Sequence, residues 1–335
     1  MKRTLVLALS LIGCLAATAS EPSADCNARH AGYKVLDMPS GRKLAVWYPT
    51  SAAEQPFRYA RATTNFDGSV ARDAPPAGCP RRPLVLFSHG LGGCALQSVF
   101  ITEELARHGY VVAAPDHRDA ATCGIDGERL RLQNLHTDRS LLEPGRWTDQ
   151  NEAARLDDLR AAIERVRADR DLARVTDTQR VGAIGHSLGG YSVLGLAGAW
   201  PSWRTPVVKA VVALSPYVTP FLVHATLAGL SAPVMYQGAE FDWGITSSIE
   251  GPKGAFAASP TPKYFVKLNG GTHLDWTNMA CTGQASVAAC LRARPNAALI
   301  VDYTLGFFDR YLKDAAAPLL EAGGLALQEY RIELR

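Results

Sequence analysis

Residues 185–189 have the sequence GHSLG, in which a serine lies between two glycines in the spacing G-x-S-x-G. This spacing is typical of a nucleophile held on a tight turn between a strand and a helix. An apolar segment at 180–184 predicts the strand, and a segment rich in small residues at 188–199 predicts the helix. We therefore predict that Ser187 attacks a carbonyl carbon, with N–H groups of the helix N-terminus directed at the same point. The alternative is a glycine-rich turn without chemistry.

A general base must accompany Ser187, because a neutral hydroxyl is a weak nucleophile. When the serine lies on such a turn, the acid follows it in the chain and the histidine comes last. His273 is the last of eight histidines and lies in a glycine-rich loop after a predicted strand at 264–268. We predict that His273 is the base and that His224, after Pro220, is a surface or packing residue.

The acid that orients His273 is expected after the preceding strand, which is predicted at 233–237. The next residues, GAEFD, hold two carboxylates, Glu240 and Asp242. We predict that Asp242 is the acid, with Glu240 as the alternative. Asp275 is too close to His273 in sequence to reach its far ring nitrogen.

An acyl-transfer site also needs N–H groups that bind the tetrahedral oxyanion. One is predicted at Leu188, the residue after the nucleophile. The other is predicted in the loop SHGLGG at 88–93, which follows a continuous apolar strand at 83–87. A glycine in this loop allows the chain to turn the N–H of Leu91 toward the serine. His89 is interpreted as a residue that holds the loop rather than as the base.

Short apolar runs alternate with longer amphipathic runs through the rest of the chain, which predicts a mostly parallel sheet with helices on both faces. Two segments stand outside this alternation: 51–82 is predicted to be a long surface connection, and 120–150 a lid or specificity loop. Strands are expected at 43–48, 83–87, 110–114, 180–184, 207–214, 233–237 and 264–268, and helices at 100–108, 152–167, 188–199 and 296–312.

Residues 1–19 combine a basic start, an apolar stretch and an A-x-A motif, which predicts a secretory signal peptide. Residues 20–335 show no repeat or break in composition and are predicted to form a single domain. An alternative interpretation takes LIGC at 11–14 as a lipobox, with Cys14 lipidated. The protein is accordingly expected to be secreted or periplasmic.

Seven cysteines are present, and the six that follow the signal segment form an even set. In an exported protein such a set predicts disulfides. No C-x-x-C or clustered histidine spacing indicates a metal site, and the predicted chemistry needs no metal or organic cofactor. The sequence favours the pair Cys281–Cys290, which flanks a short loop, and leaves Cys26–Cys79 and Cys94–Cys123 as further candidates.

Three segments together resemble the platelet-activating-factor acetylhydrolases and, equally, a bacterial group known as predicted dienelactone hydrolases. They are PLVLFSHGLGG at 83–93, ELARHGYVVAAPDHRD at 104–119 and VGAIGHSLGGYS at 181–192. LAVWYPT at 44–50 and YTLGFFDRYLK at 303–313 extend the resemblance over most of the chain. The resemblance implies an α/β-hydrolase fold and a serine esterase, with the same nucleophile, base and oxyanion donors: Ser187, His273, Leu91 and Leu188.

The chain departs from this resemblance at the acid. In the animal acetylhydrolases the acid follows the strand after the turn helix, but the matching residues here, ALSP at 213–216, include no carboxylate. The resemblance therefore implies the later position, Asp242, as in the bacterial relatives and in cutinase-like polyester hydrolases. A true dienelactone hydrolase uses cysteine as its nucleophile, so Ser187 argues against that activity.

The predicted activity is cleavage of carboxylic esters, short-chain acyl or acetyl esters above all, through an acyl-enzyme. The alternatives are an exported serine peptidase or amidase, a cutinase-like polyester hydrolase, and a silent binding protein on the same fold. A net charge of +3 over 335 residues argues against nucleic acid as a partner. The expected partner is a small-molecule or lipid ester, with membrane contact only if Cys14 is lipidated.

Overall fold

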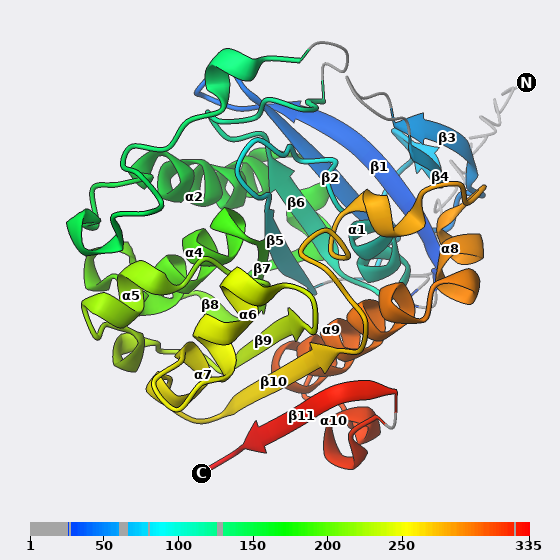
Figure 1. Cartoon of the computed structure of the whole chain (residues 1–335). Coiled ribbons are helices and arrows are strands. Elements are labelled where there is room, and N and C mark those ends of the chain that lie inside the picture. Colours follow the sequence, from blue (N-terminus) through cyan, green and yellow to red (C-terminus); the bar gives the residue numbers. More distant parts are fainter. Residues whose placement is uncertain (1–25, 27, 60–65, 80, 126–129, 325) are drawn as a thin grey trace, which may run out of the picture.

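One sheet runs through the molecule (Figure 1). The computed structural model describes residues 26, 28–59, 66–79, 81–125, 130–324 and 326–335, so the predicted signal peptide and Cys14 lie outside the described residues. Within the described part, eleven strands follow the order β11-β10-β9-β8-β7-β5-β6-β2-β1-β4-β3. They are β1 His30–Asp37, β2 Lys43–Thr50, β3 Gln55–Tyr59, β4 Phe66–Arg72, β5 Arg82–Ser88, β6 Val111–Pro115, β7 Thr176–His186, β8 Val208–Leu214, β9 Val234–Ala239, β10 Lys263–Leu268 and β11 Leu327–Glu333.

The six central strands, from β6 to β10 in the sheet, pair in parallel, while β2 and β11 flank them antiparallel. Strand β5 is buried along its whole length, as expected for a parallel strand that is covered on both faces. Its residues alternate between two apolar clusters: Val85 and Phe87 enter one, Leu84 and Leu86 the other. The sheet therefore separates two cores.

Helices cover both faces of the sheet. Residues of α1, α8, α9 and α10 belong to one core, and residues of α2 to α7 to the other; Figure 1 shows α2 and α4 on one side of the central strands and α1 and α9 on the other. The bounds are α1 Val99–Arg107, α2 Ala153–Ala168, α3 Leu172–Val175, α4 Leu188–Leu194, α5 Thr219–Val223, α6 Trp243–Glu250, α7 Ala255–Ala258, α8 Val287–Ala293, α9 Pro295–Leu312 and α10 Pro318–Ala322.

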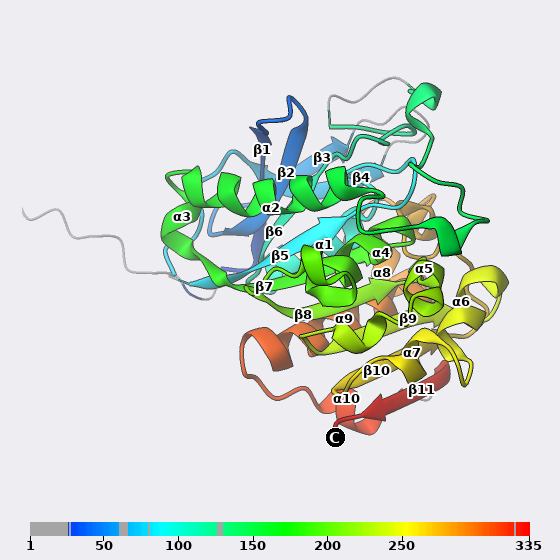
Figure 2. The ribbon, with the colours of Figure 1, turned by 90° about the vertical axis from the view of Figure 1, so that its left-hand side faces the viewer.

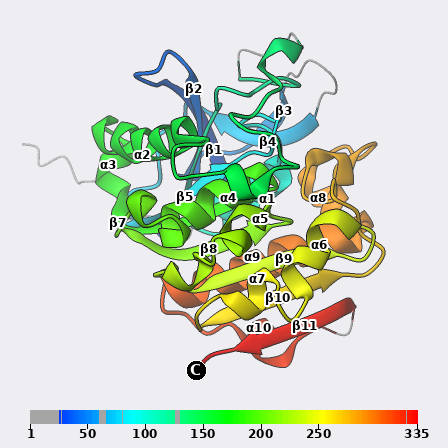
Figure 3. The same cartoon turned by 60° about the vertical axis from the view of Figure 1, so that its left-hand side comes forward.

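This architecture confirms the predicted fold class, an α/β-hydrolase fold with a mostly parallel sheet. The prediction of a long connection at 51–82 is wrong, because β3 and β4 pair there as a hairpin at one end of the sheet (Figure 3). Strands β1 and β11 were not expected either. The edge strands β3 and β11 are largely exposed or only half-buried, so no continuous apolar run marks them. The predicted helix at 188–199 ends as α4 and continues as a π-helical turn.

The carboxyl ends of the parallel strands lie at one edge of the sheet, on the right in Figure 2, together with α5 and α6. The described part of the 120–150 segment also lies there and contains only two short 3₁₀ turns, η1 Leu132–Asn134 and η2 Pro144–Arg146. Its role as a lid stays a prediction. None of the described helices is long and apolar enough to cross a membrane.

Candidate active site

Ser187 lies on the turn between β7 and α4, as its motif predicts. Its backbone adopts a φ of +54°, a left-handed conformation that is strained for a residue with a side chain. The flanking glycines are required by close approach, since a Cβ on Gly185 would collide with the carbonyl of Gly189, and a Cβ on Gly189 with that of Ser88. The turn therefore projects the serine above the carboxyl edge of the sheet.

A cavity of about 450 Å³ lies in front of this turn. It brings Ser187 together with His273 and Leu91, three of the predicted site residues. The hydroxyl of Ser187 makes no hydrogen bond to His273 among the contacts of the described residues, and such contacts commonly tighten only when substrate binds. The wall is formed by Gly90, Leu91, Gly92, Gly93, Gln97, Thr122, Cys123, His186, Ser187, His273, Leu274, Thr277 and Met279.

Asp242, rather than Glu240, lies against His273. The Nδ1 atom of His273 is 3.1 Å from Oδ1 of the buried Asp242 carboxylate. The Glu240 carboxylate instead accepts the backbone N–H of Gly270 at 2.9 Å. Burial raises the pKa of Asp242, but hydrogen bonds from His273 and Ser215 outweigh burial and hold that pKa below its ordinary value. Asp242 is thus ionised at neutral pH and can stabilise a protonated His273.

His186, the variable residue inside the G-x-S-x-G motif, connects both sides of the cavity. Its Nε2–H donates to the carbonyl of His273 at 2.9 Å, and its Nδ1 accepts the side-chain N–H of Gln97, also at 2.9 Å. The Gln97 oxygen in turn accepts the N–H of Gly90. Burial, and then the neighbouring His273, lower the pKa of His186 to about 3, so its ring is neutral at physiological pH.

The loop at 88–93 presents Leu91 as the free donor. The N–H of Gly90 is bonded to Gln97, and that of Gly92 to a carboxylate oxygen of Asp119 at 3.1 Å. No hydrogen bond of the described residues occupies the N–H of Leu91 or of Leu188. Both predicted oxyanion donors are therefore available beside Ser187.

A buried ion pair lies beneath this loop. Arg155, on α2, is 1% exposed and donates to Asp119 at 2.6 Å and to the carbonyl of His89 at 2.8 Å. The His89 ring donates to the carbonyl of Gly90 and accepts the N–H of His117, so it lies below the loop and not beside Ser187. The backbone on each side of Leu91 is thus held by side chains from distant parts of the chain.

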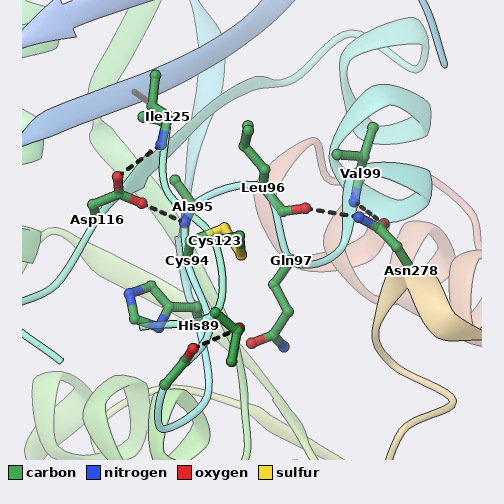
Figure 4. Close-up of a disulfide and its surroundings, with 12 residues drawn as sticks. His89, Cys94, Ala95, Leu96, Gln97, Val99, Asp116, Cys123, Ile125 and Asn278 are labelled. Carbon is green, nitrogen blue, oxygen red and sulfur yellow. Dashed lines mark hydrogen bonds between the residues drawn. A yellow bond between two sulfur atoms is a disulfide. The ribbon is translucent and has the colours of Figure 1, made fainter. Parts of the chain in front are cut away.

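A disulfide closes the cavity wall on the same side (Figure 4). Cys94, just after the loop, is bonded to Cys123, and the carboxylate of Asp116 accepts the N–H groups of Ala95 and Ile125 at 2.8 and 3.0 Å. The other two predicted pairs, Cys26–Cys79 and Cys281–Cys290, are also formed. Three disulfides indicate an oxidising compartment outside the cytoplasm.

Exposed apolar side chains are concentrated at the same edge of the sheet. Phe241 and Trp243 flank the acid and contact each other edge to face, with ring centroids 6.2 Å apart. Leu274 follows the base directly. The exposed large hydrophobic residues in the segments at this edge are Leu130, Leu132, Leu135, Leu141, Leu142, Val223, Phe241, Trp243, Leu274 and Met279.

Sequence reasoning missed four residues of this arrangement: Gln97, Arg155, His186 and Ser215. The first three act through contacts between residues 36 to 89 positions apart in the chain, and no local pattern marks such contacts. Ser215 had a signal, because it lies in the segment 213–216, where the resemblance to the animal acetylhydrolases implies an acid.

Known esterases are similar to this chain. The family model described as "Platelet-activating factor acetylhydrolase, isoform II" matches residues 51–154, a segment that ends before Ser187. "Cutinase est2" of Thermobifida alba is 27% identical over 190 residues, which is 56% of this chain and 52% of that protein. The platelet-activating factor acetylhydrolase of Cavia porcellus is 27% identical over 192 residues, 45% of this chain and 42% of that protein. The chain thus spans about half the length of the curated relatives it matches.

The solved ferulic acid esterase of Streptomyces cinnamoneus superposes with a TM-score of 0.64 at 22% identity, covering 93% of this chain and 98% of that one. At this identity the match shows the fold alone. The fold is an α/β-hydrolase fold, and the resemblance to platelet-activating-factor acetylhydrolases and related esterases is confirmed. The roles of individual residues stay predictions.

Proposed function

We propose that this chain hydrolyses carboxylic esters, with Ser187 as nucleophile, His273 as base and Asp242 as acid. The observation that carries the proposal is the cavity in which a serine on a strained turn faces a histidine whose Nδ1 meets a buried carboxylate. The similarity to cutinases and acetylhydrolases supports the same chemistry.

The reaction follows from this arrangement. Ser187 Oγ attacks the ester carbonyl while Nε2 of His273 takes its proton, and the N–H groups of Leu91 and Leu188 bind the oxyanion. The tetrahedral intermediate collapses, the C–O bond to the alcohol breaks, and His273 returns the proton to the leaving alcohol. Water then repeats the sequence on the acyl-enzyme, and the acid leaves. Asp242 stabilises His273 whenever the ring is charged.

The decisive experiment is hydrolysis of p-nitrophenyl esters, from acetyl to palmitoyl, by the wild type and by Ser187→Ala. A cavity of about 450 Å³ favours a compact acyl group. Turnover that depends on Ser187 and is highest with acetyl or butyryl is the expected result. A lack of turnover at every chain length would contradict the ester hydrolase; covalent labelling of Ser187 by a fluorophosphonate would then favour the peptidase or amidase.

A second candidate is hydrolysis of an insoluble polyester. It is favoured by the exposed apolar side chains of Leu274 and Met279 on the cavity wall, by Phe241 and Trp243 on either side of Asp242 in the chain, and by the similarity to "Cutinase est2". Release of soluble acids from a polyester film by the wild type, but not by Ser187→Ala, is the expected result for this candidate. Turnover of soluble esters without any release from the film would exclude it.

Export is proposed on the basis of the disulfides and the signal sequence. Cleavage after Ala19 would yield a secreted or periplasmic protein, whereas lipidation of Cys14 would anchor the protein to a membrane. The mass of the N-terminal peptide of protein recovered from a bacterial host distinguishes the two. An unprocessed N-terminus, starting at Met1, would contradict both.

A further inference from the structure

Ser215 follows β8 directly and is fully buried at the carboxyl edge of the sheet. Its φ is +42°, in the left-handed region. This conformation costs about 1–3 kcal/mol for a residue other than glycine and persists only where the surrounding structure holds the backbone in place. Its N–H donates to the carbonyl of Gln237 on β9 at 2.7 Å. A strained, buried serine at this place raises the question of what its hydroxyl does.

The hydroxyl lies between the base and the acid. Its O–H donates to Oδ2 of Asp242, and its oxygen is 2.8 Å from Nδ1 of His273. The other carboxylate oxygen, Oδ1, lies 3.1 Å from the same nitrogen. Because Ser215 has only one proton and gives it to the carboxylate, its oxygen accepts the Nδ1–H of His273. The single proton on Nδ1 is therefore shared between a hydroxyl and a carboxylate.

Resting on the proposed function, we propose that Ser215 is a positioning residue, which fixes the ring of His273 through Nδ1 and the carboxylate of Asp242 through Oδ2. Ser215 is not itself among the residues that line the cavity, and no hydrogen bond of the described residues joins its hydroxyl to Ser187. Its effect on the reaction passes entirely through the other two side chains.

The surroundings of His273 explain why a second anchor matters. The His273 side chain is 34% exposed, and the hydrogen bond from His186 reaches its backbone carbonyl, so that bond fixes the loop but not the orientation of the ring. Ser215, by contrast, is fixed by the sheet through its N–H. A hydroxyl at the end of a rigid strand can hold the ring on the tautomer that leaves Nε2 facing the cavity.

The charge of Asp242 supports the same role. The groups that face this carboxylate are Ser215, His273 and His186, with Thr246 at 3.4 Å from Oδ2. Burial raises the pKa of Asp242, and hydrogen bonds from His273 and Ser215 lower it again. Loss of the Ser215 hydroxyl removes a donor to the charged form, and we expect the pKa of Asp242 to rise.

The first test compares Ser215→Ala and Ser215→Gly with the wild type. Glycine tolerates a φ of +42° and therefore keeps the backbone if alanine disturbs it. Ser259→Ala is the matched control, because Ser259 is also buried with two hydrogen bonds but lies beside α7, outside the cavity wall. The readouts are kcat and KM for p-nitrophenyl acetate and the rate at which a fluorophosphonate labels Ser187.

We expect kcat and the labelling rate to fall about 10- to 100-fold in both Ser215 variants, with KM unchanged within about twofold, as for the loss of a hydrogen bond to a charged group. Ser259→Ala should lose stability and keep its rates. Rates of the Ser215 variants equal to those of the wild type would overturn the inference while leaving the proposed function intact. A wild type that neither turns over esters nor reacts with the fluorophosphonate would overturn both.

The second test moves the carboxylate. Aspartate is among the residues that best tolerate a positive φ, so Ser215→Asp can be combined with Asp242→Asn. If position 215 faces Nδ1, this double variant should exceed Asp242→Asn alone by about 10-fold or more in kcat. A double variant no faster than Asp242→Asn would overturn the placement of Ser215 at that nitrogen.

Discussion

The two walls of the cavity are built differently. The donor wall, residues 88–98, is fixed from below by the buried pair Arg155–Asp119 and from the side by the disulfide Cys94–Cys123. The base wall, residues 273–279, contacts the segment 240–243 through Asp242, whose carboxylate is buried although its neighbours are not: Phe241 is 50% and Trp243 76% exposed.

The difference follows from what each wall has to do. Backbone N–H groups stabilise an oxyanion only if they already point at it before charge develops. The N–H groups of Gly90 and Gly92, on either side of Leu91, are accordingly each bonded to a side chain. The base has to exchange protons with two different oxygens, and its wall also meets the arriving substrate. Stability is therefore expected to depend on the donor wall and substrate choice on the base wall.

Asp242→Asn should have the largest effect on turnover. The amide cannot stabilise a protonated His273, and we expect kcat to fall about 10³- to 10⁴-fold, as in other triads that lose their acid. Glu240→Gln, which changes only a bond to the Gly270 N–H, should stay within about threefold of the wild type. Steady-state kinetics on one ester compares the two, and the reverse order would transfer the acid to Glu240.

Arg155→Met should have the largest effect on stability. It leaves Asp119 buried without its cation, which costs about 3–5 kcal/mol of unfolding free energy. Arg167→Met, on the exposed face of the same helix, removes exposed hydrogen bonds to Glu164 and Thr178 and should cost about 1 kcal/mol or less. Urea unfolding measures both, and equal stability of the two variants would remove the basis for a rigid donor wall.

Replacement of both Cys94 and Cys123 by alanine tests how much the disulfide, rather than the ion pair Arg155–Asp119, fixes the donor wall. The bridge closes a loop of 29 residues, and its loss should lower the unfolding free energy by about 2–4 kcal/mol. Because the N–H of Leu91 is less well fixed, we also expect a lower kcat with little change in KM. An unchanged kcat at a reduced melting temperature would show that the bridge is not needed to fix the N–H of Leu91.

His186 connects the two walls, and its contribution to the free energy of unfolding should depend on pH. The native ring has a pKa of about 3, whereas in the unfolded chain a histidine titrates near about 6.5. As the pH falls from about 6.5 toward 3, the histidine of the unfolded chain becomes protonated while the native ring stays neutral. The contribution of His186 to the free energy of unfolding is therefore progressively lost. His186→Gln should be about 1–3 kcal/mol less stable than the wild type at pH 7. Unfolding curves at several pH values should show this gap narrowing in acid, and a gap that widens would contradict the neutral ring.

Trp243→Ala should have the smallest effect on the fold and act on substrate instead. An exposed ring contributes little to unfolding free energy, and a change within about 0.5 kcal/mol is expected. KM for long-chain or aromatic esters should rise about fivefold, since a large exposed apolar surface next to Asp242 in the chain is lost, while kcat for the acetyl ester stays constant. Val35→Ala, an exposed apolar residue on β1, serves as the control.

The parts that could be predicted from the sequence are those that local pattern determines. The continuous apolar runs of β5 and β7 and the glycines around Ser187 identify buried parallel strands and the turn between them, because burial on both faces and close packing leave few residue types possible. The order of residues along the fold then pointed to His273 and Asp242.

The remaining features arise only from folding. Strand β11 pairs with β10, which lies some 60 residues earlier in the sequence. Four of the seven residues of β11 have charged or amide side chains, so the strand contains no continuous apolar run from which it could be predicted. Ser215 and Gln97 are ordinary polar residues whose partners lie 58 and 89 positions away. Their hydrogen-bond partners depend on which strand ends lie side by side in the folded sheet, and this arrangement cannot be derived from a single sequence.

The positions of Asp119 and Arg155 have a consequence for how this protein can be altered. Asp119 lies directly before the segment 120–150, and Arg155 lies shortly after it, on α2. Their ion pair therefore joins the two ends of that segment. The entropy of closing a loop grows only slowly with its length. Residues 121–123 have to be kept, because Thr122 donates to the carbonyl of Gly92 and Cys123 is bonded to Cys94. Segments of other lengths and compositions could therefore be exchanged between Cys123 and Arg155 without disturbing the oxyanion donors, which makes this part of the chain a natural place to introduce new substrate preferences.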